Sequence, residues 1–125
     1  MEIVYELAQS WPKQGPLQVN VPSLTMEIPI APDVARRRAN GYLGMNVGVL
    51  LGASDPRLLM NDRPLWKLSV NLRLPGIGYI GQVGTIQVDA ISGVVIPLSA
   101  TTIQQYQDRA HDLVIRFTPA TEPGS

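Results

Sequence analysis

The sequence predicts an α+β fold, in which an antiparallel meander sheet of three to four strands carries two helices packed on one face. Three observations predict it. Residues 66–74 alternate apolar and polar side chains without error, as one half-buried strand does. Residues 31–53 and 101–117 carry apolar side chains at helical spacing. Glycine-rich stretches separate the alternating runs, which is typical of hairpins.

Length and composition favour one folded domain. The chain has 125 residues, which suits a single hydrophobic core. Ten Lys and Arg balance ten Asp and Glu, and this balance disfavours a nucleic acid partner without excluding one. The chain has no cysteine, which excludes disulfides and zinc-thiolate sites. We divide it into an N-terminal arm (1–23), the α+β domain (24–118) and a disordered tail (119–125).

The N-terminal region reads as an arm with little regular structure. Its first residues are acidic and lack a signal peptide pattern, and no apolar run approaches the ~20 residues that span a bilayer, so we expect a cytoplasmic protein without a membrane partner. Prolines leave room for one short strand, at residues 17–21. Residues 24–30 alternate as a second strand, and Pro29 cannot donate to a ladder, which predicts an edge strand.

The segment 31–53 is predicted to form the first helix. Pro32 and Asp33 suit its first turn. Two interpretations of its second half stay open: the helix breaks near Gly48, or it continues and is covered on both faces, the second by the arm or by another subunit. Glycines spaced four apart suggest a close approach of backbone there. The residues of this interaction hypothesis are Gly44, Met45, Gly48, Val49 and Gly52, with Pro29 on the edge strand.

The strands of the meander follow a predicted turn at residues 55–64. The strand 66–74 places Trp66 and Leu68 on the core face, and strands at 85–90 and 94–98 complete the meander. The apolar parity slips by one residue near Gly84, which predicts a β-bulge.

The last helix spans residues 101–117. Either Thr101 or Thr102, with a glutamine three residues later, offers a capping box for its start. His111 is the only histidine and lies at the margin of the apolar face, as a surface residue does. Asp112 is placed to pair with Arg116 one turn later, so we expect no catalytic carboxylate pair here.

The stretch LPGIGYIGQVGTIQVDA contains G-x-G-x-x-G at Gly76, Gly78 and Gly81. A dinucleotide site needs a helix after these glycines and an acid about 20 residues on. Here a strand pattern follows and Asp89 comes too early, so we predict a wide hairpin connection and no cofactor. Asp89 is predicted to accept hydrogen bonds from turn amides, while Gly93 takes a left-handed conformation.

Two runs resemble known families. PLWKLSVNLRL followed by GTIQVDAISGVV resembles PepSY-type domains over residues 33–98, although Ser92 replaces the usual threonine and Val94 a common glutamate. The shared positions are Trp66, Val88, Asp89, Ala90 and Gly93. This resemblance implies an inhibitory or binding module and supplies no catalytic residues. LTMEIPIAPDVARRRA is similar to small bacterial antitoxins that begin with a strand and a helix.

The sequence therefore predicts a non-enzymatic protein-interaction or inhibitory module that forms a homodimer through the glycine-bearing helix and an edge strand. One alternative is an antitoxin-like component of a toxin–antitoxin pair, in which the partner is another protein. A second alternative is a small ligand binder or enzyme that uses Arg73, Asp89 and other polar residues of the outer sheet face. A deep pocket with convergent polar groups would favour that alternative. Neither metal nor cofactor is expected.

Overall fold

The structure is a computed structural model that describes residues 3–5, 17–21, 24–60 and 62–117. Its elements in chain order are β1 (Ile3–Tyr5), β2 (Leu17–Val21), β3 (Leu24–Ile28), α1 (Pro32–Asn46), β4 (Leu51–Met60), β5 (Pro64–Leu74), β6 (Gly78–Asp89) and α2 (Ala100–Phe117).

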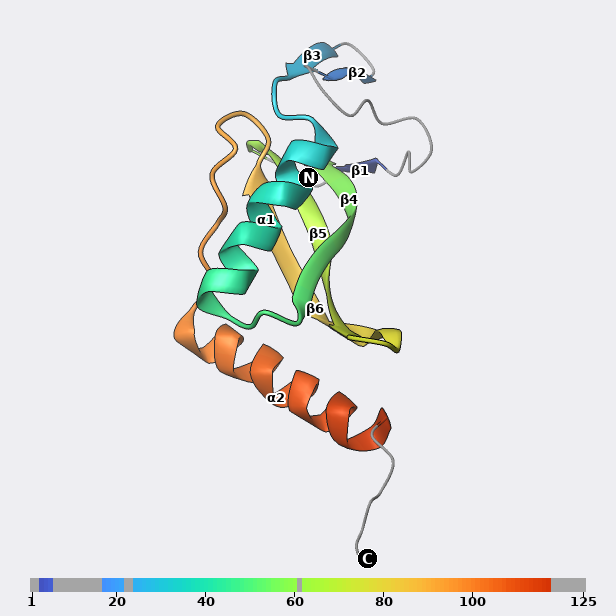
Figure 1. Ribbon diagram of the computed structural model, residues 1–125. Helices are drawn as coiled ribbons and strands as arrows, with labels where there is room; N and C mark the ends of the chain where they lie inside the picture. The colour runs from blue at the N-terminus through green and yellow to red at the C-terminus, as the bar shows by residue number, and fades with distance from the viewer. Residues whose placement is uncertain (1–2, 6–16, 22–23, 61, 118–125) are drawn as a thin grey trace, which may run out of the picture.

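The predicted α+β fold is confirmed. Strands β1, β4, β5 and β6 form a four-stranded antiparallel sheet in that order, while β2 and β3 pair as a separate two-stranded sheet. Helix α1 lies across one face of the larger sheet, and α2 crosses near the end of that face (Figure 1). The predicted strand at 17–21 is confirmed as β2, and part of the predicted arm, β1, belongs to the main sheet. The predicted tail, 119–125, lies outside the described residues.

The first helix breaks near Gly48, as one of the two interpretations predicts, and is therefore shorter than the segment 31–53. It ends at Asn46, where the amides of Val47 and Gly48 both donate to the Leu43 carbonyl. Residues 51–60, predicted as the helix end and a turn, form strand β4 instead. The predicted strand 94–98 makes only an isolated bridge, between Val95 and Val88. The meander therefore consists of β4, β5 and β6, because pairing with β5 outweighs the local helical spacing of the segment.

Asp55 and Pro56, which the sequence predicts as a turn, lie inside β4 at an irregularity of the strand. The register with β5 shifts between Ser54 and Arg57, and Asp55 takes a positive φ of 54°. A bulge tolerates Pro56 because its missing N–H interrupts no regular ladder bond there. Aspartate is among the few residues that adopt the left-handed region readily. A sequence that reads as a turn thus becomes a bent strand.

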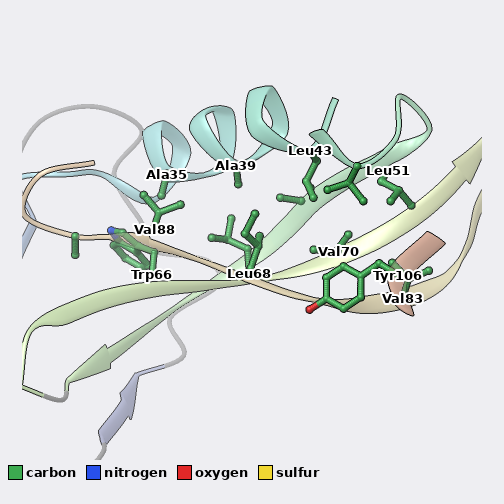
Figure 2. Close-up of a cluster of buried hydrophobic side chains, with 14 of the residues drawn as sticks. Ala35, Ala39, Leu43, Leu51, Trp66, Leu68, Val70, Val83, Val88 and Tyr106 are labelled. Carbon is green, nitrogen blue, oxygen red and sulfur yellow. The ribbon is translucent and has the colours of Figure 1, made fainter. Parts of the chain in front are cut away.

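The core lies between α1 and the sheet. Ala35, Ala39 and Leu43 of α1 face Leu68 and its neighbours in the sheet (Figure 2). Two alanines at the centre of the contact let the helix backbone approach the strands closely. The side chains of β5 alternate as predicted, with the core positions buried and most intervening ones at least partly exposed.

Helix α2 docks through a tyrosine and a glycine. Tyr106 is buried, and its ring occupies the space that a Cβ on Gly84 would need. Its hydroxyl donates to the Thr85 carbonyl at 2.6 Å and accepts from the Thr85 amide at 2.9 Å. The bulge predicted near Gly84 is confirmed, since Val83 lies between the pairs that Gly84 and Gln82 make with β5.

The start of α2 differs from the prediction in its cap. The helix begins at Ala100, and the amide of Thr102 donates to the Ser99 hydroxyl at 3.1 Å. Ser99 therefore takes the capping role that was predicted for Thr101 or Thr102.

Side chains cover backbone groups along both edges of the meander. On β6, Tyr106 binds both backbone groups of Thr85, and Arg109 donates to the Val83 carbonyl at 2.7 Å. On β4, the Asn40 side-chain oxygen accepts from the Ala53 amide at 2.7 Å. Such contacts occupy groups that a further strand would need, so they disfavour addition of a strand at these positions.

Candidate functional site

The glycine-rich stretch is a hairpin, as predicted, but a tight one. Strand β5 ends at Leu74, which pairs with Gly78 at the start of β6. Gly76 and Gly78 have φ values of 77° and 96°, and the Ile77 amide donates to the Leu74 carbonyl at 3.1 Å. Gly81 lies inside β6, where a Cβ would approach Leu113 of α2 at 3.1 Å. The glycines therefore serve the turn and the docking of α2, and no helix follows them to bind a phosphate.

Asp89 is a turn residue, as predicted. Its Oδ1 accepts from the amides of Ile91 and Ser92 at 2.8 and 2.9 Å, and Gly93 has a φ of 78°. The sequence did not predict its ion pair with Arg63, whose Nε donates to Oδ2 at 2.7 Å. Hydrogen bonds from Arg63, and then from the turn amides, hold the pKa of Asp89 well below its usual range, although burial opposes them.

Asp89 and Arg73, grouped by the sequence hypothesis of a ligand site, lie at opposite ends of β5. Asp89 pairs with Leu65 at one end, while Arg73 pairs with Tyr79 at the other. Eight residues of strand separate the two positions, which corresponds to about 26 Å. Asp89 is therefore outside any site that contains Arg73.

The outer face of the sheet carries a polar hollow of about 520 Å³. Its floor includes Ser69, Asn71 and Arg73, the outward residues of β5. Residues of β4 and β6 line it as well, together with two residues of α1 that lie beside the edge of β4. These residues are Arg36, Asn40, Gly52, Ala53, Ser54, Asp55, Tyr79 and Gln82. We call this the outer-face hollow.

Irregular pairing accompanies the outer-face hollow. Three register shifts occur opposite residues 67–73 of β5, one in β4 and two in β6. Bulges bend a strand and increase its twist, and they are over-represented beside functional sites. Three of them around one short stretch of β5 bend the outer face locally, at the place where the hollow lies.

An apolar groove of about 400 Å³ lies beside the hairpin. The loop after α1 supplies Val49 and Leu50, and the hairpin supplies Leu74 and Pro75. Val49 is 85% exposed and Ile77, at the hairpin tip, is 61% exposed. We call these five residues the hairpin-end surface.

The residues of the interaction hypothesis do not form one helical face. Gly44 and Met45 lie in α1, Gly48 and Val49 in the following loop, and Gly52 in β4. Met45 and Val49 are both largely exposed, at 87% and 85%. Pro29 follows β3, which ends at Ile28, two residues earlier than predicted, so it precedes α1 and Met45 lies near the other end of that helix. The structure thus keeps the Gly44–Val49 segment together and separates Pro29 from it.

The remaining charged residues of α1 and the histidine of α2 form no further candidate site. Asp33 pairs with Arg36 at 2.7 Å and with Arg37 at 3.4 Å, while Arg38 turns away to donate to the Gly93 carbonyl. His111 is exposed on α2. Within the described residues, no three His, Cys, Asp or Glu side chains gather as metal ligands would. None of the described helices combines the length and apolar character needed to cross a membrane.

Comparison with known proteins identifies no relative. No family model matches the chain, and no curated protein or solved structure matches it either. The residues shared with PepSY-type domains are structural here: Trp66 is buried and donates to the Ile30 carbonyl at 2.7 Å, and Asp89 organises a turn. Two surfaces therefore remain as candidate sites, the outer-face hollow and the hairpin-end surface.

Proposed function

We propose that the protein is a non-enzymatic protein-interaction module that forms a homodimer through the hairpin-end surface. The exposure of large apolar side chains there supports the proposal most directly, with Val49 at 85% and Ile77 at 61%. Removal of apolar surface from water contributes about 25 cal/mol per Å² to association. Exposed apolar patches often mark an interaction site.

A second copy of the chain is the occupant that the charges favour. The formal net charge is zero, so two copies approach one another without net repulsion. In a two-fold dimer each surface meets its own copy, and an apolar surface is self-complementary in a way that a charged one is not. The covered edges of β4 and β6 make a continuous intersubunit sheet at Ala53 or Thr85 a poor alternative.

Substitution of Val49 by glutamate tests the proposal. We expect wild-type protein to be dimeric at ~100 µM and Val49→Glu to be monomeric, because association would remove the charged side chain from water. Light scattering after size-exclusion chromatography gives the mass. Val94→Glu is the matched control, since Val94 is also exposed, at 58%, but lies in the segment after β6 at the other end of the strand.

A wild-type monomer throughout the concentration range would contradict the homodimer. So would a Val49→Glu protein that remains dimeric. An inhibitory or antitoxin-like role would place a different protein on the same surface, and in that case the isolated chain would be monomeric.

A further inference from the structure

The outer-face hollow contains hydrogen-bonding groups that the described part of the fold leaves unused. Asn71 is only 8% exposed, and its side-chain nitrogen donates to the Ser54 hydroxyl at 2.5 Å. Among the described residues, none donates to the Asn71 side-chain oxygen, and the Ser54 hydroxyl hydrogen has no acceptor. A buried amide oxygen without a partner costs free energy, which a hydroxyl group of a ligand or of water would recover.

The charge around the hollow is mainly positive. Arg73 lines it and makes no ion pair with any described residue, whereas Arg36 is partly neutralised by Asp33. A smaller depression of about 220 Å³ shares Asp55, Ser69 and Gln82 with the hollow and adds Arg57 and Lys67. Among the described residues, Asp55 is the only acidic one in either lining. The surroundings therefore favour an acid group and disfavour an amine.

We propose that the outer-face hollow binds a small polyhydroxylated acid, a sugar or polyol that carries a carboxylate or a phosphate. Arg73 binds the acid group, because a guanidinium presents paired N–H donors to such oxygens. Asn71 accepts from a ligand hydroxyl, while Ser54 donates to a neighbouring one. Tyr79 also lines the hollow, and its ring offers an apolar face for the carbon skeleton.

The lining distinguishes this ligand from other small molecules. A hydroxyl group both donates and accepts, which matches a free acceptor on Asn71 beside a free donor on Ser54. An amine would meet repulsion from Arg73. A planar base is best held between two apolar faces, whereas this lining supplies one aromatic ring. The volume of about 520 Å³ lies within the usual range for small-molecule sites.

Amide NMR titration of the full chain tests the proposal with four probes: glucuronate, glucose-6-phosphate, glucose and inorganic phosphate. We expect the two acidic sugars to produce saturable shifts in the amides of residues 52–55 and 69–73. The acidic sugar that binds more tightly identifies the acid group as carboxylate or phosphate. Glucose and inorganic phosphate each carry half of the chemistry, so we expect each to bind at least about tenfold more weakly.

Arg73→Gln should weaken binding of the acidic sugar that binds more tightly by about tenfold. In the spectrum of the free protein, it should change only the amide signals of residues near position 73. Arg116→Gln removes the same charge from an exposed position on α2 and should leave the affinity unaltered. Four results overturn the proposal: no saturable shift below about 10 mM of either acidic sugar, equal affinity for inorganic phosphate or glucose, shifts centred elsewhere, or no effect of Arg73→Gln. Gly52 and Arg73 also line the groove beside the hairpin, so light scattering checks that wild type and Arg73→Gln have the same mass before their affinities are compared.

Discussion

The two ends of β5 differ in how far their large side chains are buried and their charged groups are paired. At the end that begins at Pro64, Trp66 is fully buried and the Asp89 carboxylate is bound by Arg63 and two turn amides. At the end that finishes at Leu74, Ile77 is exposed and Arg73 has no ion-pair partner among the described residues. The first end pairs its carboxylate and buries its tryptophan, while the second end leaves an arginine and a large apolar side chain exposed. We therefore expect the first end to contribute more to stability, and the second end carries the surfaces proposed for binding.

The largest effect is expected at the buried end. Trp66→Ala should lower the free energy of unfolding by about 4 kcal/mol, because it removes a fully buried aromatic side chain and leaves the Ile30 carbonyl without its donor. Urea denaturation followed by circular dichroism measures the loss. A loss below about 1 kcal/mol would show that this end does not dominate stability.

A smaller, pH-dependent effect is expected from the carboxylate at the same end. Asp89→Asn should cost about 2 kcal/mol at neutral pH, because the new amide nitrogen faces Arg63 in place of a charged acceptor. The pKa of Asp89 is lower in the folded chain than in the unfolded one, where it lies near about 3.9. Its contribution is therefore complete above about pH 5 and is lost as the pH falls through the folded-state pKa.

Urea denaturation at a series of pH values measures this linkage. The difference in stability between wild type and Asp89→Asn should narrow steadily as the pH falls below about 4. Asp108→Asn is the control, because Asp108 is an exposed residue of α2 that accepts a hydrogen bond from Gln104. A difference that stays constant with pH would contradict the role assigned to the Asp89 charge.

The smallest effect on stability is expected at the open end. Ile77→Ser should change the free energy of unfolding by no more than about 0.5 kcal/mol, because the side chain is already 61% exposed. The same substitution should weaken the proposed dimer, which sedimentation equilibrium measures. A large loss of stability in the monomer would mean that the hairpin tip supports the fold, and the contrast between the two ends would fail.

Much of the fold could be predicted because its signals are local. The alternation in β5, the apolar face of α2 and the turn at Asp89 each depend on residues a few positions apart. The glycines of the hairpin could be assigned from the strands on either side. The bulge near Gly84 was visible as a slip in parity, although its packing against Tyr106 was not.

Of the candidate sites, the sequence predicted only part. Arg73 was assigned to the polar outer face, because alternation in β5 places it there with Ser69 and Asn71. Ser54 and Asp55 were missed, since their segment carries the Asp-Pro signal of a turn. The interpretation in which the first helix continues past Gly48 was wrong, because it aligned glycines that the fold places in a helix, a loop and a strand.

By itself, the sequence determined which segments form a helix or a strand where the apolar spacing runs along the whole element, as in β5 and α2. Side-chain spacing along a helix or strand is a local property. Only the tertiary structure decided that residues 51–60 pair with β5, that Asp55–Pro56 becomes a bulge, and that the polar groups of three strands and one helix line one hollow. Backbone hydrogen bonds between strands depend on residues distant in the chain, and their gain across the whole ladder outweighs the helical preference of one segment.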